Sequence, residues 1–527
     1  MQKTDFSIME DNLMKTLSRI FGFLLLLNYS FAQNVLVSDF PVSDVTNASV
    51  YRPALAVAPN GSYVVTWGDS RLGTQNRTGG EGDIYARLLG VNGTPLTSNF
   101  KVDNVSFTAF YSDFSIFFSS PTFTPSGQLF IIWHVHGVSA IGGIQSDDVY
   151  YSAFSGTGQR LAADVQLNMV GKSTGGMATR PNVAFRSPST FLAVYEYSKN
   201  GANIGGTLVD ISSGALLGDA FEMSDNAFNN RIYPRVSSNG NYTVTVWTDS
   251  RTDAKGDIWS ERIVGNQLAS SNVKVNDDPA GGYNEYASVA MDAQGNYVVV
   301  WIDTRSNAGG DLYGQRFDAQ GNKIRSNFKL TKSNSKLWEY PPGIAMKSDG
   351  SYVVTWADDV TQTGNNFTAK TRFFSSTDQP LSDVIQVTTA PSAQPDVKIG
   401  ATGAVIYAWN DGRENVNLGR IYSKIYAGFP TTAVEENNAP LSFRLDQNYP
   451  NPFNPTTTIS YHLSAQSHVV LKVTDILGRE IVTLVNEQKA PGLHNVQWNA
   501  LQAPSGIYLC RLEAESNVAT RKLLLVK

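Results

Sequence analysis

The sequence predicts an all-β protein made of a seven-bladed β-propeller and a small C-terminal β-sandwich. A strand-like segment recurs along residues 33–427, and its anchor residues lie 52 to 66 residues apart. A repeat of this length built from short strands is typical of propeller blades. The composition agrees, because only 17% of the residues are charged while Gly, Tyr, Phe and Trp are plentiful. That balance favours a turn-rich β protein.

The repeat is clearest at Tyr297-Val-Val-Val-Trp301, which is followed by Ile-Asp303-Thr-Arg305 and then by Gly310-Asp311-Leu-Tyr313. Other units keep this order of residues to different degrees. The third unit is degenerate, because Tyr195 replaces tryptophan and Asp-x-Arg is absent. The predicted structural repeat residues are Trp67, Asp69, Arg71, Trp133, Tyr195, Trp247, Asp249, Arg251, Trp301, Asp303, Arg305, Trp356, Asp358, Trp409, Asp411 and Arg413.

Each unit divides into four predicted strands, with the tryptophan on the second. The second strands are apolar at successive positions, which indicates a strand covered on both faces. Seven units supply strands one to three, but a fourth strand follows only the first six. The segment Asn34-Val-Leu-Val37 supplies the missing strand, so we expect the N-terminal strand to close the ring. Six blades with one irregular insertion remain an alternative because the third unit is degenerate.

Residues 1–32 are predicted to be a secretory signal peptide that starts at Met14. A basic segment over residues 14–19 precedes an apolar run over residues 20–27, and a small-x-small cleavage site ends at Ala32. The apolar run is too short to span a bilayer, and we expect no transmembrane segment elsewhere. The mature chain is therefore expected to be secreted.

Charge and cysteine content narrow the classes of partner and fold. The net charge is −5 and no run of Lys or Arg occurs, so we expect no nucleic-acid partner. Cys510 is the only cysteine, so the chain cannot form an internal disulfide. It lies in the strand-like run Gly506-Ile-Tyr-Leu-Cys510, where we expect it to act as a small apolar residue.

Residues 428–441 have the composition of a linker, and residues 442–527 contain short strand-like runs separated by turns. This last segment resembles the type A sorting domain of the type IX secretion system, in the family's order of motifs. The motif residues are Asn448, Pro450, Asn451, Pro452, Phe453, Asn454, Pro455, Gly478, Arg479, Gly506, Tyr508, Lys522 and Lys527.

The resemblance implies an immunoglobulin-like C-terminal signal that an outer-membrane translocon reads and that is often removed. It also implies delivery to the cell surface or medium of a Bacteroidetes-type bacterium, with the type IX machinery as partner. In that family the final strand, here residues 521–527, carries much of the recognition. The alternative is an ordinary sandwich module that stays on the protein.

The repeated acids allow a metal site or a structural brace. Asp249 with Asp257, and Asp303 with Asp311, could hold Ca²⁺ between the second and third strands of their units. The alternative is a copied structural brace, in which Asp303 accepts from strand-end amides or pairs with Arg305 or with an arginine of a neighbouring blade. We favour the brace because the pattern recurs in most units, whereas a single functional site would occur once. No other cofactor is predicted.

Catalysis has weak support in the sequence. Glycosidases on propellers use a pair of carboxylates, and candidates at loop entries to the channel are Glu285 and Glu339, with Glu196 as a third lone acid. The Ser-x-Asp-x-Gly-x-Thr-Trp boxes of sialidases are absent. His134 and His136 fall on one face of a strand, but no third metal ligand is evident.

The predicted function is a secreted or cell-surface binding protein without catalytic activity, with a glycan or a protein as ligand. Aromatic residues such as Tyr233, Tyr283, Tyr286 and Tyr340 lie in the connections between units, and loop-borne aromatic surfaces suit such ligands. The alternatives are an extracellular glycosidase or lyase that acts on polysaccharides, and a structural component of a surface layer.

Overall fold

The computed structural model describes most of the chain beyond residue 34, and the predicted signal peptide lies outside the described residues. No helix long and apolar enough to cross a membrane occurs in the part that is described. The chain divides into two compact units, Met1–Pro430 and Thr431–Lys527. The described ranges are 35–44, 48–71, 82–104, 111–139, 145–167, 178–187, 189–198, 202–218, 220–225, 230–264, 267–269, 271–278, 282–331, 336–337, 340–359, 361, 363, 366–414, 419–430, 444–445, 448, 451–463, 466–489, 492–515 and 517–526.

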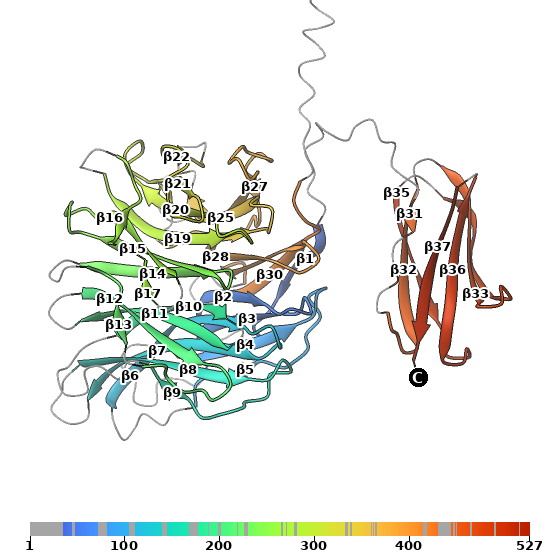
Figure 1. Cartoon of the computed structure of the whole chain (residues 1–527), viewed down its shortest axis with the longest axis horizontal. Helices are drawn as coiled ribbons and strands as arrows, with labels where there is room; N and C mark the ends of the chain where they lie inside the picture. Colours follow the sequence, from blue (N-terminus) through green and yellow to red (C-terminus); the bar gives the residue numbers. More distant parts are fainter. Residues whose placement is uncertain are drawn as a thin grey trace, which may run out of the picture. The chain divides into compact units, whose positions relative to one another are not determined.

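The first unit contains seven antiparallel sheets arranged as the blades of a propeller, which confirms the predicted fold class (Figure 1). Most sheets have four strands. In chain order the blades are β2 (Val50–Val57), β3 (Tyr63–Asp69), β4 (Asp83–Leu89) and β5 (Phe100–Lys101); β6 (Tyr111–Phe123), β7 (Leu129–Ser139), β8 (Gln145–Phe154) and β9 (Val165–Gln166); β10 (Ala178–Ser187), β11 (Thr190–Ser198), β12 (Ala202–Asp210) and β13 (Phe221–Glu222); β14 (Arg231–Ser238), β15 (Tyr242–Asp249), β16 (Asp257–Val264), β17 (Gln267–Leu268) and β18 (Val273–Lys274); β19 (Asn284–Met291), β20 (Tyr297–Asp303), β21 (Asp311–Phe317) and β22 (Phe328–Lys329); β23 (Lys336–Leu337), β24 (Gly343–Met346), β25 (Tyr352–Asp359), β26 (Thr368–Phe374) and β27 (Ile385–Gln386); and β28 (Ser392–Ile399), β29 (Val405–Asp411), β30 (Arg420–Tyr426) and β1 (Val35–Pro41).

The seventh blade takes its fourth strand from the other end of the unit. Strand β1 pairs antiparallel with β30, and the Val42 N–H donates to the Ile421 carbonyl at 2.7 Å. The ring is therefore closed by residues about 380 positions apart in the sequence, which leaves no unpaired edge between the first and last blades. The degenerate third unit forms a regular four-stranded sheet, and the Tyr195 hydroxyl lies 2.7 Å from Thr207 Oγ1.

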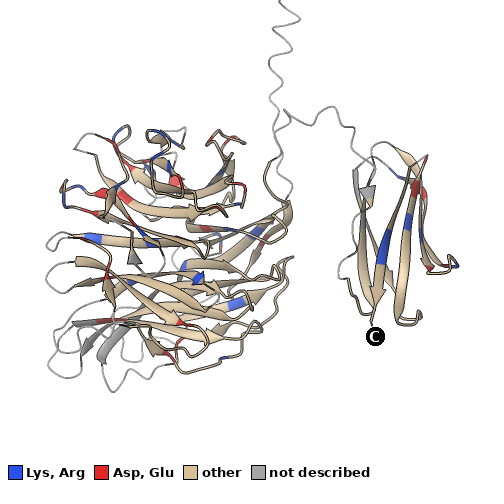
Figure 2. Cartoon of the chain, viewed as in Figure 1, with Lys and Arg blue, Asp and Glu red and all other residues tan. Residues whose placement is uncertain are grey.

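The core of the first unit lies between neighbouring blades. Every residue of β3 and of β25 is buried, as expected for second strands that are covered on both faces. Trp301 is fully buried and packs with Val244 and Val246 of the preceding blade. Charged residues of both signs gather mainly near turns and strand ends, while the middles of the strands are largely uncharged (Figure 2).

Two details depart from the predicted pattern. The fourth and sixth blades have five strands, because both β17 and β18 pair with β16, and both β23 and β24 pair with β25. The predicted linker begins at residue 428, but Phe429 still packs against the hydrophobic cluster between the sixth and seventh blades. Its ring lies edge-on to that of Phe373, with ring centroids 4.9 Å apart. The packed part of the first unit therefore extends a few residues into the segment whose composition suggested a linker.

The turn between the first and second strands requires glycine for two reasons. Gly295 has a φ of +93°, which side-chain-bearing residues rarely adopt. A Cβ atom on Gly295 would also lie 2.4 Å from the ring of Tyr242 in the neighbouring blade. The same residue therefore closes a hairpin and lets two blades approach.

The second unit is a two-sheet sandwich. One sheet has the order β31-β32-β35 and the other β34-β33-β36-β37. Alternate residues of β33 and β36 point inward and form one hydrophobic core with Trp498 and Phe453. The strands are β31 (Arg444–Leu445), β32 (Thr456–Leu463), β33 (Ser467–Asp475), β34 (Glu480–Lys489), β35 (Gly492–Asn499), β36 (Gly506–Ala514) and β37 (Asn517–Leu525).

Cys510 is expected to be unreactive while the sandwich is folded. Its side chain is fully buried on β36, and burial raises the pKa of its thiol to about 12. Because the thiolate is the nucleophile, we expect alkylation by iodoacetamide at pH 8 to be at least ~100-fold slower than in the unfolded chain, measured by mass spectrometry. The double variant Cys510→Ala, Ile507→Cys places a thiol at an exposed position of the same strand and should react quickly. Rapid labelling of native Cys510 would contradict this prediction.

Candidate functional site

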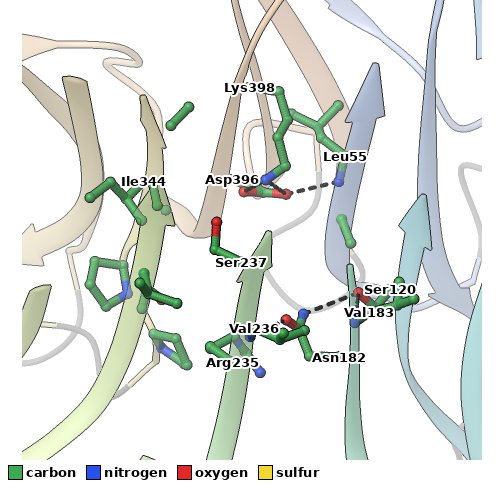
Figure 3. Close-up of a pocket in the computed structure, with 18 of the residues that line it drawn as sticks. Leu55, Ser120, Asn182, Val183, Arg235, Val236, Ser237, Ile344, Asp396 and Lys398 are labelled. Carbon is green, nitrogen blue, oxygen red and sulfur yellow. Dashed lines mark hydrogen bonds and ion pairs between the residues drawn. The ribbon is translucent and has the colours of Figure 1, made fainter. Parts of the chain in front are cut away.

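A central cavity lies where the innermost strands of the seven blades meet (Figure 3). Its volume is about 350 Å³, which lies at the small end of the range for small-molecule pockets. Every blade contributes to its wall, so the site exists only in the closed ring. The contributing strands are β2, β6, β10, β14, β19, β24 and β28.

A bulge interrupts six of these innermost strands at the same level. In β2, for example, the register with β3 shifts between Tyr51 and Ala54, and Arg52 has a φ of 53°. Positive φ is uncommon for residues with side chains, and a bulge re-aims the side chain that it carries. Phe118 lines the cavity, and the other bulged positions precede lining residues in their strands, so we call the six positions the rim. They are Arg52, Phe118, Arg180, Tyr233, Tyr286 and Gln394.

The rim joins arginines to aromatic rings. The Arg52 guanidinium lies 4.1 Å from the centroid of the Phe118 ring, and the Arg180 guanidinium lies 4.6 Å from that of Tyr233. The rings of Tyr233 and Tyr286 are 4.7 Å apart. The rim therefore presents aromatic surface and positive charge together, from neighbouring blades.

Below the rim, one residue per blade occupies an equivalent position, each two residues beyond the bulge in the six bulged strands. Three of these side chains join blades by accepting the N–H of the next innermost strand. Asp396 Oδ2 accepts from Leu55 N at 2.8 Å, Ser120 Oγ from Val183 N at 3.3 Å, and Asn182 Oδ1 from Val236 N at 2.9 Å. The seven residues are Ala54, Ser120, Asn182, Arg235, Ser288, Gly343 and Asp396.

Asp396, which lines the cavity, and Glu196, which contacts the rim, are both held by hydrogen-bond donors. Glu196 is buried and accepts from Arg180 Nη1 at 2.6 Å and from the Tyr233 N–H at 2.6 Å. Burial raises the pKa of Glu196, although Arg180 and the Tyr233 N–H offset part of this effect. Asp396 binds Lys398 Nζ at 3.0 Å in addition to its bond with Leu55 N.

The two predicted catalytic candidates are not brought together as a described pair. Glu285 is half-buried on β19, next to the rim residue Tyr286. Glu339 lies outside the described residues. Of the histidines, His134 is buried, while His136 pairs with Asp147. No group of three or more His, Cys, Asp or Glu side chains with metal-binding geometry occurs among the described residues.

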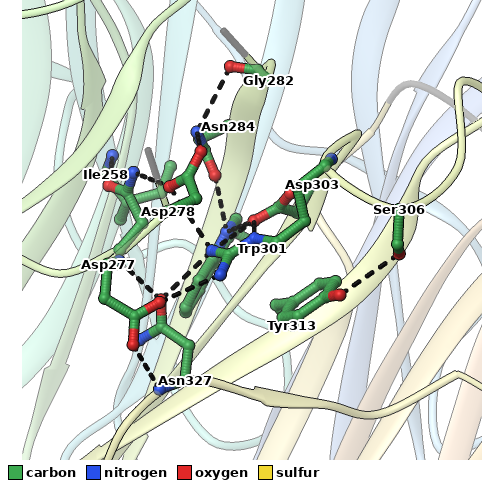
Figure 4. Close-up of polar contacts among 12 residues, drawn as sticks. Ile258, Asp277, Asp278, Gly282, Asn284, Trp301, Asp303, Ser306, Tyr313 and Asn327 are labelled. Carbon is green, nitrogen blue, oxygen red and sulfur yellow. Dashed lines mark hydrogen bonds and ion pairs between the residues drawn. The ribbon is translucent and has the colours of Figure 1, made fainter. Parts of the chain in front are cut away.

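The repeated Trp-x-Asp-x-Arg segment forms a compact hydrogen-bonded unit at the same end of the blades as the rim (Figure 4). In the fifth blade, Trp301 Nε1 donates to Asp303 Oδ2 at 3.1 Å, and Arg305 donates its backbone N–H to Oδ1 at 2.8 Å and its Nε to Oδ2 at 2.8 Å. The bond from Trp to Asp recurs in the first, fourth, sixth and seventh blades, through Asp69, Asp249, Asp358 and Asp411.

The arginine of this segment also reaches the preceding blade. Arg305 Nη1 donates to Asp277 Oδ1 at 2.9 Å, on the connection from the fourth blade. Burial alone would lower the pKa of Arg305, but its bonds to Asp303 and Asp277 raise it overall. Arg71 makes an equivalent bridge to Asp44 at 2.9 Å, and Arg251 bridges to Asp225.

The second acid of each proposed calcium pair lies directly across the hairpin from the first. Asp303 is the cross-strand partner of Asp311, and Asp249 of Asp257. Asp311 accepts from Thr331 Oγ1 and Ser306 Oγ, both at 2.8 Å, and pairs with Lys329. All these carboxylates therefore have protein donors. We propose that they act as structural braces and not as a calcium site.

The sequence singled out two rim residues, Tyr233 and Tyr286, as aromatics between units, but it did not predict the rim as a set. The signals that could have found the rim are the repeated X-Pro pairs in the first strands, such as Arg52-Pro53, Arg180-Pro181 and Gln394-Pro395. An inter-blade bond was also missed: Asn327 Nδ2 donates to the Val275 carbonyl at 3.3 Å, and Asn99 and Asn272 make equivalent bonds. The repeated Asn-x-Lys sequence of the fourth strands is the pattern that could have predicted this bond.

In the sandwich, the sorting motif contacts the last strand. Asn451 Oδ1 accepts from Leu524 N at 2.8 Å, and its Nδ2 donates to the Lys522 carbonyl at 3.2 Å. Phe453 exchanges backbone hydrogen bonds with Leu524 and Val526. Hydrogen bonds thus join the first motif of the predicted signal to its last strand. Pro450 and Lys527 lie outside the described residues, and Asn448, Pro452, Asn454, Pro455, Gly478, Arg479, Gly506 and Tyr508 are all described.

Comparisons with solved structures find weak likenesses for the first unit. A protein of unknown function from Dyadobacter fermentans matches with a TM-score of 0.45 and 10% identity, over 74% of this chain and 98% of that chain. The α-L-arabinofuranosidase Arb93A from Fusarium graminearum matches with a TM-score of 0.40 and 11% identity, over 59% and 92%. The NanB sialidase from Streptococcus pneumoniae matches with a TM-score of 0.43 and 9% identity, over 73% and 70%.

A search of curated proteins finds no match to this chain. A family model described as the secretion system C-terminal sorting domain matches residues 447–527. This match covers the segment whose motifs resemble the type A sorting signal, and it implies secretion to the cell surface or the exterior. The C-terminal unit is therefore a sorting domain of the type IX secretion system.

Proposed function

We propose that the chain is an exported, non-catalytic binding protein whose ligand, a glycan or a protein, enters the central cavity from the bulged rim. A signal peptide over residues 1–32 would start its export, and the sorting domain would pass it to the type IX machinery. The observation that supports binding is the cavity itself, because its rim offers aromatic rings and cations, while Glu196 and Asp396 are held in structural bonds.

The bonds of Glu196 and Asp396 weigh against a role for these two acids in a glycosidase. Hydrolysis of a glycosidic bond needs a carboxylic acid and a carboxylate on either side of the bond. Glu196 is buried behind the rim, and Asp396 is fixed by Lys398 and Leu55. These two acids serve the joints between blades, as the propeller needs.

Retention of the intact chain on immobilised polysaccharides tests this proposal. We expect saturable binding to at least one polymer without release of reducing ends. Ser237, which lines the cavity, offers a variant that fills it: Ser237→Trp should abolish retention, whereas Ser212→Trp on an exposed turn should not. Release of sugar would contradict the non-catalytic proposal. Binding that survives Ser237→Trp would place the ligand elsewhere on the molecule.

A further inference from the structure

Arg235 is the exception in the ring of equivalent residues below the rim. The other six positions carry Ala, Ser, Asn, Ser, Gly and Asp, and three of them use short polar side chains to join blades. Arg235 makes no such joint within the described part of the chain. It lies half-buried on β14, across the ring from Asp396 and Lys398 on β28 (Figure 3).

Arg235 forms no ion pair with any residue that the structure describes. Its hydrogen bond is from Nη1 to the carbonyl of the adjacent Pro234, at 3.1 Å. Burial lowers the pKa of its guanidinium, and Tyr340 and Asp396 lie near enough to offset only part of this effect. Asp396 is already shared between Lys398 and Leu55 N. A cation that is partly withdrawn from water without an anionic partner is unfavourable for the fold, so the cavity holds a charge that a ligand could neutralise.

The braces show what the chain does with arginines that serve the fold. Arg251 and Arg305 each bind a buried aspartate, and those bonds raise their pKa above the ordinary value despite burial. Arg235 has the opposite shift and, among the described residues, no aspartate of its own. Its place in the wall of a cavity, together with this lack of a partner, separates it from the structural arginines.

The rest of the cavity adds aromatic surface and further positive charge near Arg235. Tyr340 lies close enough to Arg235, Arg52 and Tyr233 for their charges to affect its hydroxyl. Lys398 lies on the opposite wall, paired with Asp396. The described groups whose charges act on Arg235 are the Tyr340 and Tyr233 phenols and two carboxylates, Asp396 and Glu196. Both carboxylates already have partners, because Asp396 binds Lys398 and Glu196 binds Arg180.

We propose that the cavity binds a saccharide that carries a carboxylate, such as a uronic acid unit, with the carboxylate on the Arg235 guanidinium and the sugar ring against the tyrosines of the rim. A planar guanidinium matches a carboxylate with two parallel hydrogen bonds. A cavity of about 350 Å³ fits one small unit, whereas a protein partner needs a surface of roughly 800 Å² on each side. This inference rests on the proposed binding function and names its ligand class.

Paired polymers provide the test. The intact chain is passed over immobilised polygalacturonate, alginate and hyaluronan, and over the same polymers after chemical reduction of their carboxylates to alcohols. We expect saturable binding to at least one acidic polymer, and a loss of binding to its reduced form. Arg235→Gln should weaken that binding by about 10- to 100-fold. Arg235→Lys, which keeps the charge but loses the planar fork, should retain part of it.

Two controls separate this site from general charge attraction. Lys347→Gln removes one positive charge from the hairpin turn after β24, at the far end of the blade from the rim, and should change binding less than about twofold. Poly-glutamate tests for an acidic protein segment as the ligand. Binding of poly-glutamate with no binding of any uronate polymer would overturn the saccharide assignment.

Thermal stability distinguishes a ligand-binding arginine from a structural one. Arg235→Met replaces an unpaired cation with an apolar side chain of similar length, so we expect the ligand-free Tm to rise by a few degrees while binding is lost. A fall in Tm would mean that Arg235 supports the fold, and it would overturn the proposal.

The remaining outcomes distinguish failure of the carboxylate inference from failure of the proposed binding function. Retention on neutral and carboxyl-reduced polymers that is unchanged in Arg235→Gln would overturn the carboxylate inference and leave the binding function standing. No retention on any polymer, acidic or neutral, would overturn the saccharide inference and remove the glycan branch of the proposed function.

Discussion

Asp303→Ala is expected to lower the free energy of unfolding of the first unit by about 2–4 kcal/mol, because it removes a buried carboxylate that accepts several hydrogen bonds. Asp303 is fully buried and accepts bonds from the Trp301 indole and from the backbone and side chain of Arg305. Without it, the indole keeps only its bond to Asn284, at 3.1 Å, among the described residues. Arg305 keeps its contacts with Asp277, Asp278 and Asn327.

Chemical denaturation followed by tryptophan fluorescence would measure this change in the intact chain. Trp498 is the one tryptophan of nine that belongs to the second unit, so the signal reports mainly on the propeller. Asp349→Ala is a suitable control, because Asp349 pairs with Lys347 on an exposed hairpin turn. We expect that change to cost no more than about 1 kcal/mol. Equal effects of the two variants would contradict a structural brace.

A double-mutant cycle with Arg305→Ala would give the coupling between the two side chains. Added calcium independently tests the hypothesis that the same acids bind calcium. A brace predicts a Tm that does not respond to calcium or chelator. A calcium-dependent rise in Tm that Asp303→Ala removes would instead restore the calcium site at Asp303 and Asp311, since a ligand stabilises the state that binds it.

The blade fold was predictable because one short-range pattern is copied seven times. A strand such as Tyr297–Trp301 is apolar on both faces, and the glycine turn before it fixes the hairpin. Even the degenerate third unit keeps this local pattern around Tyr195. Closure of the ring followed from counting strands, since a missing fourth strand must come from the other end of the unit.

The cavity could not be predicted because its chemistry depends on register between blades. The sequence around Arg235 reads like any other first strand, and only the bulge at Tyr233 places Arg235 level with Asp396 from a distant blade. The brace was foreseen as a repeated pair. The bridge from Arg305 to Asp277 was not predicted for these residues. A periodic signal for it exists, because Asp44 and Arg71, Asp225 and Arg251, and Asp277 and Arg305 lie 26 to 28 residues apart.

Asp103→Asn is expected to stabilise the first unit at pH 8 and to have little effect at pH 4.5. Asp103 is buried, accepts from the Ile84 N–H at 2.8 Å, and shares Lys101 with Asp83. In the fourth and fifth blades the equivalent bond to the third strand is made by Asn276 and Thr331, which also donate to the neighbouring aspartate. Asp103 can donate to Asp83 only when it is protonated.

The sign of the pH effect follows from this pairing. Burial, and then the charge of Asp83, raise the pKa of Asp103 to about 7 from an ordinary value of 3.8. Between these values the folded chain holds a proton that the unfolded chain has lost, so the contribution of Asp103 to stability falls as the pH rises from about 4 to 7. The loss is on the order of 4 kcal/mol when complete. The amide that Asp103→Asn introduces is a donor at every pH. The stability of the variant should therefore lack the part of the pH dependence that Asp103 causes.

Denaturation curves of the parent chain and the variant at pH 4.5, 6 and 8 would test the slope. Asp349→Asn serves as the control, because hydrogen bonds and the charge of Lys347 outweigh burial and lower the pKa of Asp349 to about 2. Its contribution is lost only as the pH falls below about 4, so it leaves the slope between pH 4.5 and 8 unchanged. Parallel pH profiles for Asp103→Asn and the parent chain would show that Asp103 is ionised in the folded blade across this range, with Lys101 balancing both carboxylates.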